Sequence, residues 1–241
     1  MIDFTNKKVI EYPYPITIVE ECFDDKTLGK LIEEYPDVSG EQTVMGGRKN
    51  LKAGEWLSEY PTWKQFYDYL NDESLFQSMI NDHSEELEKW DSVITNRNSL
   101  DTDCFLYLDI ATATDGYYRE IHRDTDKRIW NFLIFLNDKD WEGGDFLIHS
   151  SDKMSMYPRQ IFDTSMFDLP VEKVIEAKKN RGVFFLSVPN SYHSVSVQSK
   201  TNTPRNFLYG SYSTNCPGIC KLKCSSDFSS YSFNLLRYPS A

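Results

Sequence analysis

The spacing of hydrophobic positions divides the chain into two parts. After a short run rich in β-branched residues at positions 14–19, apolar residues recur at helical spacing as far as about residue 91. From residue 103 onward, apolar residues instead gather in short runs. The first part therefore predicts a strand followed by helices, and the predicted helices cover residues 24–36, 62–70 and 72–91.

Local signals set the limits of the first helix and of the segment that follows it. Asp24 or Asp25 is the expected N-cap and Pro36 the stop. Residues 39–54 are polar and rich in glycine, which predicts a loop.

The second part predicts an antiparallel sandwich or barrel, because many short β-branched and aromatic runs alternate with turn residues. Residues 150–180 interrupt the strands as an insertion, whose end, VEKVIEAKKN, predicts a short helix. Residues 215–241 predict an irregular tail. The predicted strands cover residues 104–113, 129–137, 145–149, 182–188, 193–198 and 205–213.

Composition narrows the class of protein. At 241 residues, 40% hydrophobic and 15% aromatic, the chain can bury a core and is expected to form a single domain over residues 1–241. The net charge of −11 disfavours a general role on nucleic acid or on an anionic membrane. No apolar run is long enough to span a membrane, and no secretory signal is visible. Five cysteines without a framework spacing favour a reducing, cytoplasmic setting.

Three residues predict a metal site. His122 and Asp124 stand two apart, so in an extended chain both side chains point to one face. His193 lies just past a turn that follows a strongly apolar strand. Two histidines and one carboxylate on one face of a metal form the facial triad of non-haem Fe(II) oxygenases, which leaves coordination positions open. A surface pair and a strand-end histidine are the alternatives.

Arg205 adds a candidate anion site. It stands on a strand that appears buried, and arginine is rarely buried without a partner. A dicarboxylate co-substrate would supply one, because the guanidinium holds a carboxylate in a bidentate fork. A salt bridge on an exposed strand face is the alternative.

Taken together, four blocks resemble the Fe(II)- and 2-oxoglutarate-dependent dioxygenases, within them the prolyl-hydroxylase-like branch. The blocks are Tyr107 followed by GYYREIHRD, then RIWNFLIFLNDKDWEGGDF, RGVFFLSVPNSYHSVSV and PRNFLYGSYS. The resemblance spans about residues 104–213. It implies a double-stranded β-helix, a cupin-like jelly roll over residues 103–214, with the helices of residues 1–100 packed on one sheet.

The resemblance also implies roles for individual residues. His122, Asp124 and His193 would bind Fe(II), Arg205 would bind the far carboxylate of 2-oxoglutarate, and O₂ would take a remaining site. Ascorbate is a possible reductant. The products would be succinate, CO₂ and a hydroxylated substrate, either an amino acid, a prolyl-like peptide or another small molecule. Asp124 argues against halogenation, because related halogenases carry a small residue there.

Some positions depart from the family pattern. Phe135 stands where some relatives carry a tyrosine that touches the far carboxylate, and Tyr107 or Tyr209 would have to supply that hydroxyl; we favour Tyr107. Phe207 stands where relatives often carry serine or threonine. Asn131 is predicted either to donate a hydrogen bond to the co-substrate or to point outward.

Several other candidates are weaker. We expect His83 to be a core or boundary residue and His149 to be a solvated strand end rather than a substrate contact. We expect Trp130 and Trp141 to be core and loop anchors. The spacing of Cys216, Cys220 and Cys224 does not favour zinc.

Function classes other than an oxygenase remain open. A non-catalytic cupin-like module would hold a metal or small molecule without turnover, and a nucleic-acid demethylase would need a local basic groove. We expect substrate to be recognised by residues 39–54, which carry Arg48, Lys49 and Lys52, and by the insertion at residues 150–180.

Overall fold

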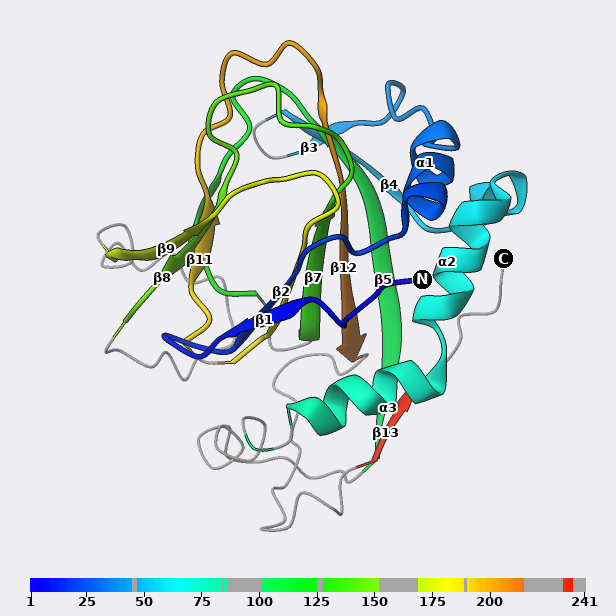
Figure 1. The fold of residues 1–241 in the computed structure, drawn as a ribbon, viewed down its shortest axis with the longest axis vertical. Helices are drawn as coiled ribbons and strands as arrows, with labels where there is room; N and C mark the ends of the chain where they lie inside the picture. Colours follow the sequence, from blue (N-terminus) through cyan, green and yellow to red (C-terminus); the bar gives the residue numbers. More distant parts are fainter. Residues whose placement is uncertain are drawn as a thin grey trace.

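The fold consists of two β-sheets with helices beside the larger one (Figure 1). The computed structural model describes residues 1–44, 47–83, 85, 101–124, 128–151, 169–188, 190–214 and 232–235. The three predicted helices are confirmed within these residues, and a 3₁₀ turn joins two of them. The helical elements are α1 (Asp25–Glu33), η1 (Glu55–Glu59), α2 (Pro61–Leu70) and α3 (Glu73–Asp82).

Strands of the large sheet come from both ends of the chain. Its spatial order is β1-β2-β10-β7-β12-β5-β4-β3, and β13 pairs with β5 in parallel while the other pairings are antiparallel. The strands are β1 (Lys7–Ile10), β2 (Ile16–Val19), β3 (Thr43–Val44), β4 (Arg48–Lys52), β5 (Asp101–Ala113), β7 (Arg128–Phe135), β10 (Gly182–Leu186), β12 (Arg205–Thr214) and β13 (Ser232–Leu235).

The small sheet faces the large one and has the order β6-β11-β8-β9 (Figure 1). Aromatic rings join the two sheets: Phe146 of the small sheet and Phe185 of β10 lie 5.4 Å apart, ring centre to ring centre. The strands are β6 (Arg119–His122), β8 (Phe146–His149), β9 (Val171–Ile175) and β11 (His193–Val195).

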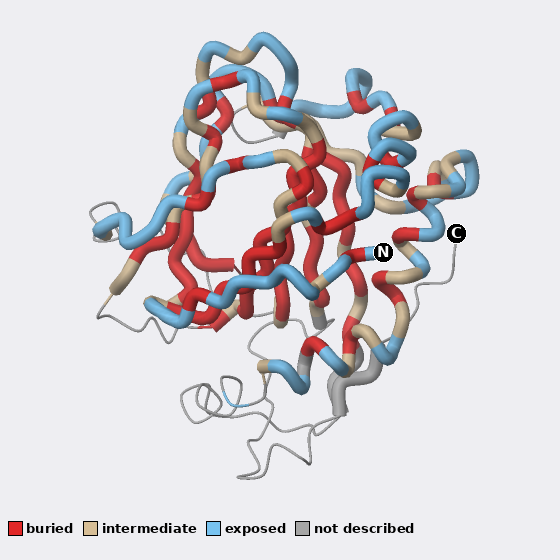
Figure 2. Tube along the Cα trace, in the orientation of Figure 1, coloured by how far each residue is buried: buried red, intermediate tan, exposed pale blue. Residues whose placement is uncertain are grey.

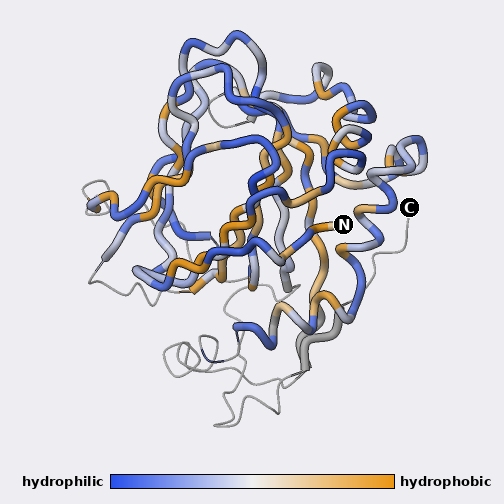
Figure 3. The backbone as a smooth tube through the Cα atoms, in the orientation of Figure 1, coloured by the Kyte–Doolittle hydropathy of each residue, from blue (hydrophilic) through white to orange (hydrophobic). Residues whose placement is uncertain are grey.

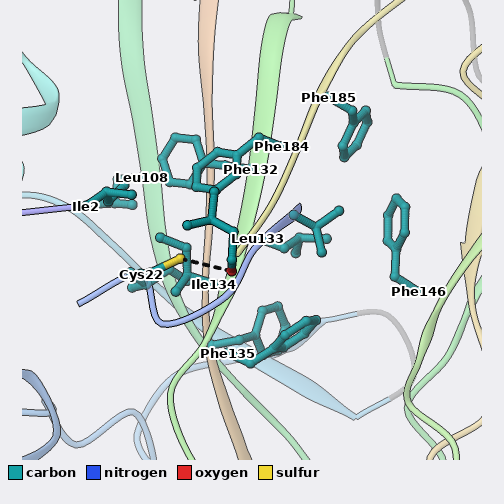
Figure 4. Packing of buried hydrophobic residues seen from close by; sticks show 14 of the residues in the cluster. Ile2, Cys22, Leu108, Phe132, Leu133, Ile134, Phe135, Phe146, Phe184 and Phe185 are labelled. Carbon is teal, nitrogen blue, oxygen red and sulfur yellow. Dashed lines mark hydrogen bonds between the residues drawn. The ribbon is translucent and has the colours of Figure 1, made fainter. Parts of the chain in front are cut away.

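The outer face of the large sheet packs on the helices. Tyr212 of β12 stacks near Phe76 of α3, with ring centres 4.9 Å apart, and its hydroxyl donates to the backbone oxygen of Leu70 at 2.6 Å. Figure 4 shows Phe132 and Phe184 side by side on this face, and the central strands are the most buried and hydrophobic part of the chain (Figures 2 and 3). Burial of these aromatic side chains stabilises the fold.

Helix α1 begins where one of the two candidate caps lies. The Asp24 carboxylate accepts a hydrogen bond from the backbone N–H of Thr27 at 2.8 Å, so Asp24 is the N-cap. Among the described residues, no helix has the length and apolar character needed to cross a membrane.

Two predictions of local structure were wrong. Residues 39–54 are not a loop throughout, because Arg48–Lys52 form β4 and pair with β5. VEKVIEAKKN does not form a helix, because Val171–Ile175 form β9 and pair with β8. Both strands carry many charged residues; β9 is an edge strand, and β4 has only the two-residue β3 on its outer side. Charged side chains are common on such strands and weaken the sequence signal for a strand.

Two further regions differ from expectation or lie outside the described residues. Within the tail, where irregular structure was expected, Ser232–Leu235 form β13. Cys216, Cys220 and Cys224, and most of the insertion at residues 150–180, lie outside the described residues.

Candidate metal and anion site

Strand pairing brings three candidate metal ligands together. His122 ends β6, Asp124 follows two residues later, and His193 begins the neighbouring strand β11. His193 is the direct cross-strand partner of His122. Side chains of directly opposed residues on one face of a sheet lie close together, and here the two imidazole centres are 4.3 Å apart.

The three side chains offer their ligand atoms to one point. Oδ1 of Asp124 lies 3.9 Å from Nε2 of His122, and Oδ2 lies 3.8 Å from Nε2 of His193. One ligand atom from each residue lies within 4.8 Å of the others, and all three residues are buried. Two imidazoles and one carboxylate converging in this way form a facial N₂O ligand set, which suits a transition metal with open coordination positions.

Hydrogen bonds fix which nitrogen of each histidine is available. Nδ1 of His122 lies 2.7 Å from the backbone oxygen of Glu120, and Nδ1 of His193 lies 2.9 Å from that of Ser191. Because a carbonyl oxygen can only accept, both Nδ1 atoms carry the proton. The lone pair of each Nε2 therefore points to the shared point, which is the second-shell arrangement usual for metal-binding histidines.

The charge states of the three residues suit a cation. Burial lowers the pKa of His122 to about 3 and also lowers the pKa of His193, so both imidazoles are neutral at pH 7. Burial alone would raise the pKa of Asp124, but Arg128 and the two histidines lower it below its usual value. Oδ2 of Asp124 is buried without a hydrogen-bond partner, which is costly unless a cation satisfies it.

Arg205 forms a second, positively charged centre on the inner face of the large sheet. It is the first residue of β12 and is 1% exposed. Its Nη1 donates to the backbone oxygen of Gly144 at 2.7 Å, and its Nε is buried without a partner. Burial lowers the pKa of Arg205 only to about 10, so the group stays charged at pH 7. No carboxylate of the described residues lies within 4.0 Å of it, and a buried cation of this kind fits a carboxylate ligand.

The glycine pair of the second sequence block makes room for this arginine. Gly144 has a φ of +69°, a left-handed conformation that favours glycine. A Cβ at this position would lie 3.2 Å from Nη1 of Arg205. The Gly143-Gly144 turn thus presents a carbonyl to the guanidinium at close range.

A comparison with known families identifies this region. The sequence model of the 2OG-Fe(II) oxygenase superfamily matches residues 107–210, a segment that contains the three candidate ligands and Arg205. Residues 107–210 belong to this superfamily. This match agrees with the resemblance of the four sequence blocks. A search among curated proteins found no significant match.

Solved structures confirm the predicted double-stranded β-helix fold. A prolyl-4-hydroxylase from Pseudomonas putida superposes with a TM-score of 0.51 at 13% identity, covering 83% of this chain and 93% of that one. A prolyl hydroxylase from Trichoplax adhaerens, solved with a peptide of hypoxia inducible factor, gives 0.50 at 13%, covering 82% and 83%. The epimerase SnoN of nogalamycin biosynthesis gives 0.52 at 13%, covering 82% and 78%.

Two further candidate residues also lie on the inner face of the large sheet. Asn131 is fully buried and donates from Nδ2 to Oγ of Ser187 at 2.6 Å, while its Oδ1 has no partner. It therefore does not point outward. Its cross-strand partner Phe185 packs its ring against His193, with centres 4.9 Å apart. Tyr107 donates its hydroxyl to Oδ2 of Asp109 at 2.6 Å.

Sequence reasoning passed over one tyrosine beside Arg205. The ring of Tyr117 lies 5.6 Å from the Arg205 guanidinium carbon, alongside the rings of Phe135 and Phe207. Tyr117 stands in the block GYYREIHRD, so its place just before the metal pair was the available signal.

The remaining histidines lie outside the candidate ligand set. His149 is buried rather than solvated, and its Nε2 and Nδ1 lie 2.8 Å from Oγ of Ser194 and 3.1 Å from the backbone oxygen of Leu169. The prediction of a solvated strand end was thus wrong, because β8 is covered at this end. His83 is partly buried near Trp130, which is itself a core residue as predicted.

Proposed function

We propose that this chain is an active Fe(II)- and 2-oxoglutarate-dependent dioxygenase that hydroxylates an amino-acid, peptidyl or small-molecule substrate. The observation that carries the proposal is the convergence of three buried ligand atoms within 4.8 Å of one another. Arg205 on the inner face of the large sheet supports it, because its buried Nε has no hydrogen-bond partner and it has no carboxylate within 4.0 Å among the described residues.

Each candidate residue has a defined task in this proposal. Nε2 of His122, Nε2 of His193 and the carboxylate of Asp124 hold the metal. Arg128, whose Nη1 lies 3.0 Å from Oδ1 of Asp124, keeps that carboxylate ionised and oriented. Arg205 holds the far carboxylate of 2-oxoglutarate, and Asn131 offers its amide to the co-substrate. We keep Tyr107 as a further candidate for that contact, although its hydroxyl already donates to Asp109.

The apolar residues around the site have a separate task. The rings of Phe185 and Phe146 pack on His193, with centres 4.9 and 5.2 Å away. They shield the ligands from bulk water on that side, which strengthens electrostatic interactions at the metal. Bound iron with 2-oxoglutarate and O₂ would supply the oxidant: one oxygen atom enters the substrate C–H bond, the other enters succinate, and CO₂ leaves.

Turnover without added substrate tests this proposal against a non-catalytic binding module. Purified protein with Fe(II), 2-oxoglutarate, O₂ and ascorbate is expected to release succinate slowly, and the H193A variant is expected to release none. Metal binding is measured separately with Mn(II) by calorimetry. Metal binding without succinate release would favour the binding module, and absence of both would reject the site.

The substrate class has weaker support. The Trichoplax neighbour was solved with a peptide, which is a property of that protein, and at 13% identity the likeness supports a fold rather than a substrate. We therefore propose a screen of peptides and metabolites that reads succinate release.

A further inference from the structure

Strand β4 presents alternate side chains to the interior of the barrel. Arg48, Asn50 and Lys52 are the cross-strand partners of Ala113, Ala111 and Asp109 on β5. Ala113 is also the partner of Arg205 on the other side of β5. Arg48 and Arg205 therefore belong to one row on one face of the sheet, two strand spacings or about 10 Å of backbone apart.

The neighbouring lysine points the other way. Side chains alternate along a strand, so Lys49 lies on the opposite face from Arg48. Its ammonium group accordingly donates to the backbone oxygen of Ser39 outside the barrel. Of the two adjacent cations, only Arg48 reaches the interior.

The guanidinium of Arg48 has aromatic neighbours but no anionic partner. Its central carbon lies 5.8 Å from the ring centre of Tyr209 and 6.0 Å from that of Tyr117. Its Nε is buried without a hydrogen-bond partner. Within the described part of the chain, no carboxylate oxygen lies within 4.0 Å of an Arg48 nitrogen. Buried polar atoms are normally paired, so this atom is available to a ligand.

Two other cations lie beside Tyr209 and its neighbour Tyr107, whose ring centres are 6.4 Å apart. The guanidinium carbon of Arg128 lies 4.8 Å from the ring centre of Tyr209, and the ammonium of Lys52 lies 5.8 Å from that of Tyr107. Lys52 is exposed at the end of β4, and we call its position the rim of the barrel. The chain as a whole is acidic, with a net charge of −11, so this gathering of cations is a local feature.

An irregularity in the small sheet adds a further cation. The register between β6 and β11 shifts, so that Arg119 rather than Glu120 lies opposite Val195. Glu120 is exposed, whereas Arg119 is partly buried. Burial lowers the pKa of Arg119, and the charges of Arg48 and Arg128 act in the same direction. Arg48 and Arg128 are thus near enough to Arg119 to affect its pKa.

Asp109 and Asp124, two carboxylates of the described residues that lie nearby, already have partners. Oδ2 of Asp109 accepts from Tyr107 and from Nδ2 of Asn50, at 2.6 and 2.8 Å. Asp124 pairs with Arg128 and is a candidate metal ligand. Among the described residues, Arg48 is therefore left without a carboxylate partner, even with the far carboxylate of 2-oxoglutarate assigned to Arg205.

We propose that Arg48, with Lys52 at the rim, binds an anionic group of the prime substrate, a carboxylate or a phosphate. This inference rests on the proposed function, because it assigns a charge class to the substrate of that same site. Arg48 would hold the anionic group in a bidentate fork between Tyr117 and Tyr209. The substrate atom to be oxidised would then lie toward the metal ligands, on the side of Arg128.

A binding experiment tests the anion site without turnover. The protein is loaded with Mn(II) and saturated with 2-oxoglutarate under anaerobic conditions, so that the metal site and Arg205 are occupied. Inorganic phosphate, and separately acetate, is then titrated by calorimetry at constant ionic strength. We expect saturable binding of at least one anion, weakened at least tenfold in Arg48→Met, restored in part by Arg48→Lys and unchanged in the matched control Lys49→Met. Equal binding by wild type and Arg48→Met, or no binding by wild type, would overturn the proposal.

A turnover experiment identifies the source of the anion. Succinate release is measured with carboxylic acids against their amides, and with sugar phosphates against the free sugars. We expect stimulation by the charged member of a pair, and an increase of at least tenfold in its KM in Arg48→Met. Stimulation by the neutral member would contradict the proposal, and a raised KM for 2-oxoglutarate itself in Arg48→Met would assign Arg48 to the co-substrate instead. If wild type never releases succinate, the proposed function fails. The phosphate and acetate titrations would still test whether Arg48 binds an anion.

Discussion

The two faces of the large sheet differ in how many of their buried polar atoms have hydrogen-bond partners, although the same strands form both faces. On the outer face, Phe132, Leu208 and Tyr212 pack under the helices, and the Tyr212 hydroxyl is paired with Leu70. Among the described residues on that face, the indole nitrogen of Trp130 is the single buried polar side-chain atom without a hydrogen-bond partner.

In the part of the chain that the structure describes, the inner face carries five such atoms on the same set of strands. They belong to Arg48, Asn50, Asp109, Asn131 and Arg205. Each unpaired buried polar atom costs free energy, so a protein keeps them together only where something else can pair with them. The outer face therefore stabilises the fold, and we expect the inner face to bind ligands. Substitutions on the two faces should then affect different measurements.

The largest effect is expected at the metal site. Asp124→Ala removes the carboxylate shared by both histidines and should lower succinate release at least ~100-fold. It should also abolish the rise in unfolding temperature that Mn(II) or Fe(II) gives wild type, a rise that follows from binding to the folded state alone. Metal content and thermal unfolding are measured on the same preparations. The control is Glu120→Ala, an exposed side chain two residues before His122, and one iron per chain retained in Asp124→Ala would place the site elsewhere.

The second largest effect is expected on the KM for 2-oxoglutarate. Arg205→Met removes a charge-assisted bidentate contact to a buried carboxylate, a loss of ~2–4 kcal/mol, which corresponds to a KM for 2-oxoglutarate raised roughly 30- to 1,000-fold. The unfolding free energy without ligand should not fall, because a buried cation without an anionic partner does not stabilise the fold. Arg205→Lys keeps the charge but not the fork, so its KM should be intermediate. An unchanged KM in Arg205→Met would exclude this residue as the anchor.

The outer face should respond in stability rather than in co-substrate binding. Gly210 of β12 pairs with Phe132 of β7, and a Cβ at Gly210 would lie 2.1 Å from the Phe132 ring. That ring is fully buried and packed beside Phe184, so Gly210→Ala should destabilise the fold by about 1–3 kcal/mol through overpacking. Denaturant unfolding measures the change.

Gly29 provides the matched control for this substitution. It lies on the exposed side of α1, and a Cβ there would meet no atom within 4 Å. Gly29→Ala should therefore stabilise the protein by roughly 0.5–1 kcal/mol, because alanine favours the helix. Equal effects of the two substitutions would show that the outer face is less tightly packed than its contacts indicate.

The same contrast explains what the sequence could predict. The apolar strands β7, β10 and β12 were predictable because their residues are buried on both faces, and His122 and Asp124 were predictable because they stand two residues apart. Strands β4 and β9 were missed because their charged side chains are those expected of loops or helices. Burial of Arg48 inside the barrel depends on the register between β4 and β5, and a shift of one residue would have put Lys49 there instead. A sequence without pairing information does not set that register.

The smallest effects should come from two tyrosines on opposite faces of β12. Tyr212→Phe removes the hydroxyl that donates to the Leu70 carbonyl and leaves that buried oxygen with one partner fewer, so the unfolding free energy should fall by about 1 kcal/mol. Tyr209 lies on the inner face, where its ring contacts Arg48 and Arg128. Tyr209→Phe keeps a ring for those contacts, so its unfolding free energy should stay within ~0.5 kcal/mol of wild type. Denaturant unfolding of both variants compares them in one assay. A loss of stability as large in Tyr209→Phe as in Tyr212→Phe would mean that the inner face also holds the fold together, and the separation of the two faces would then be wrong.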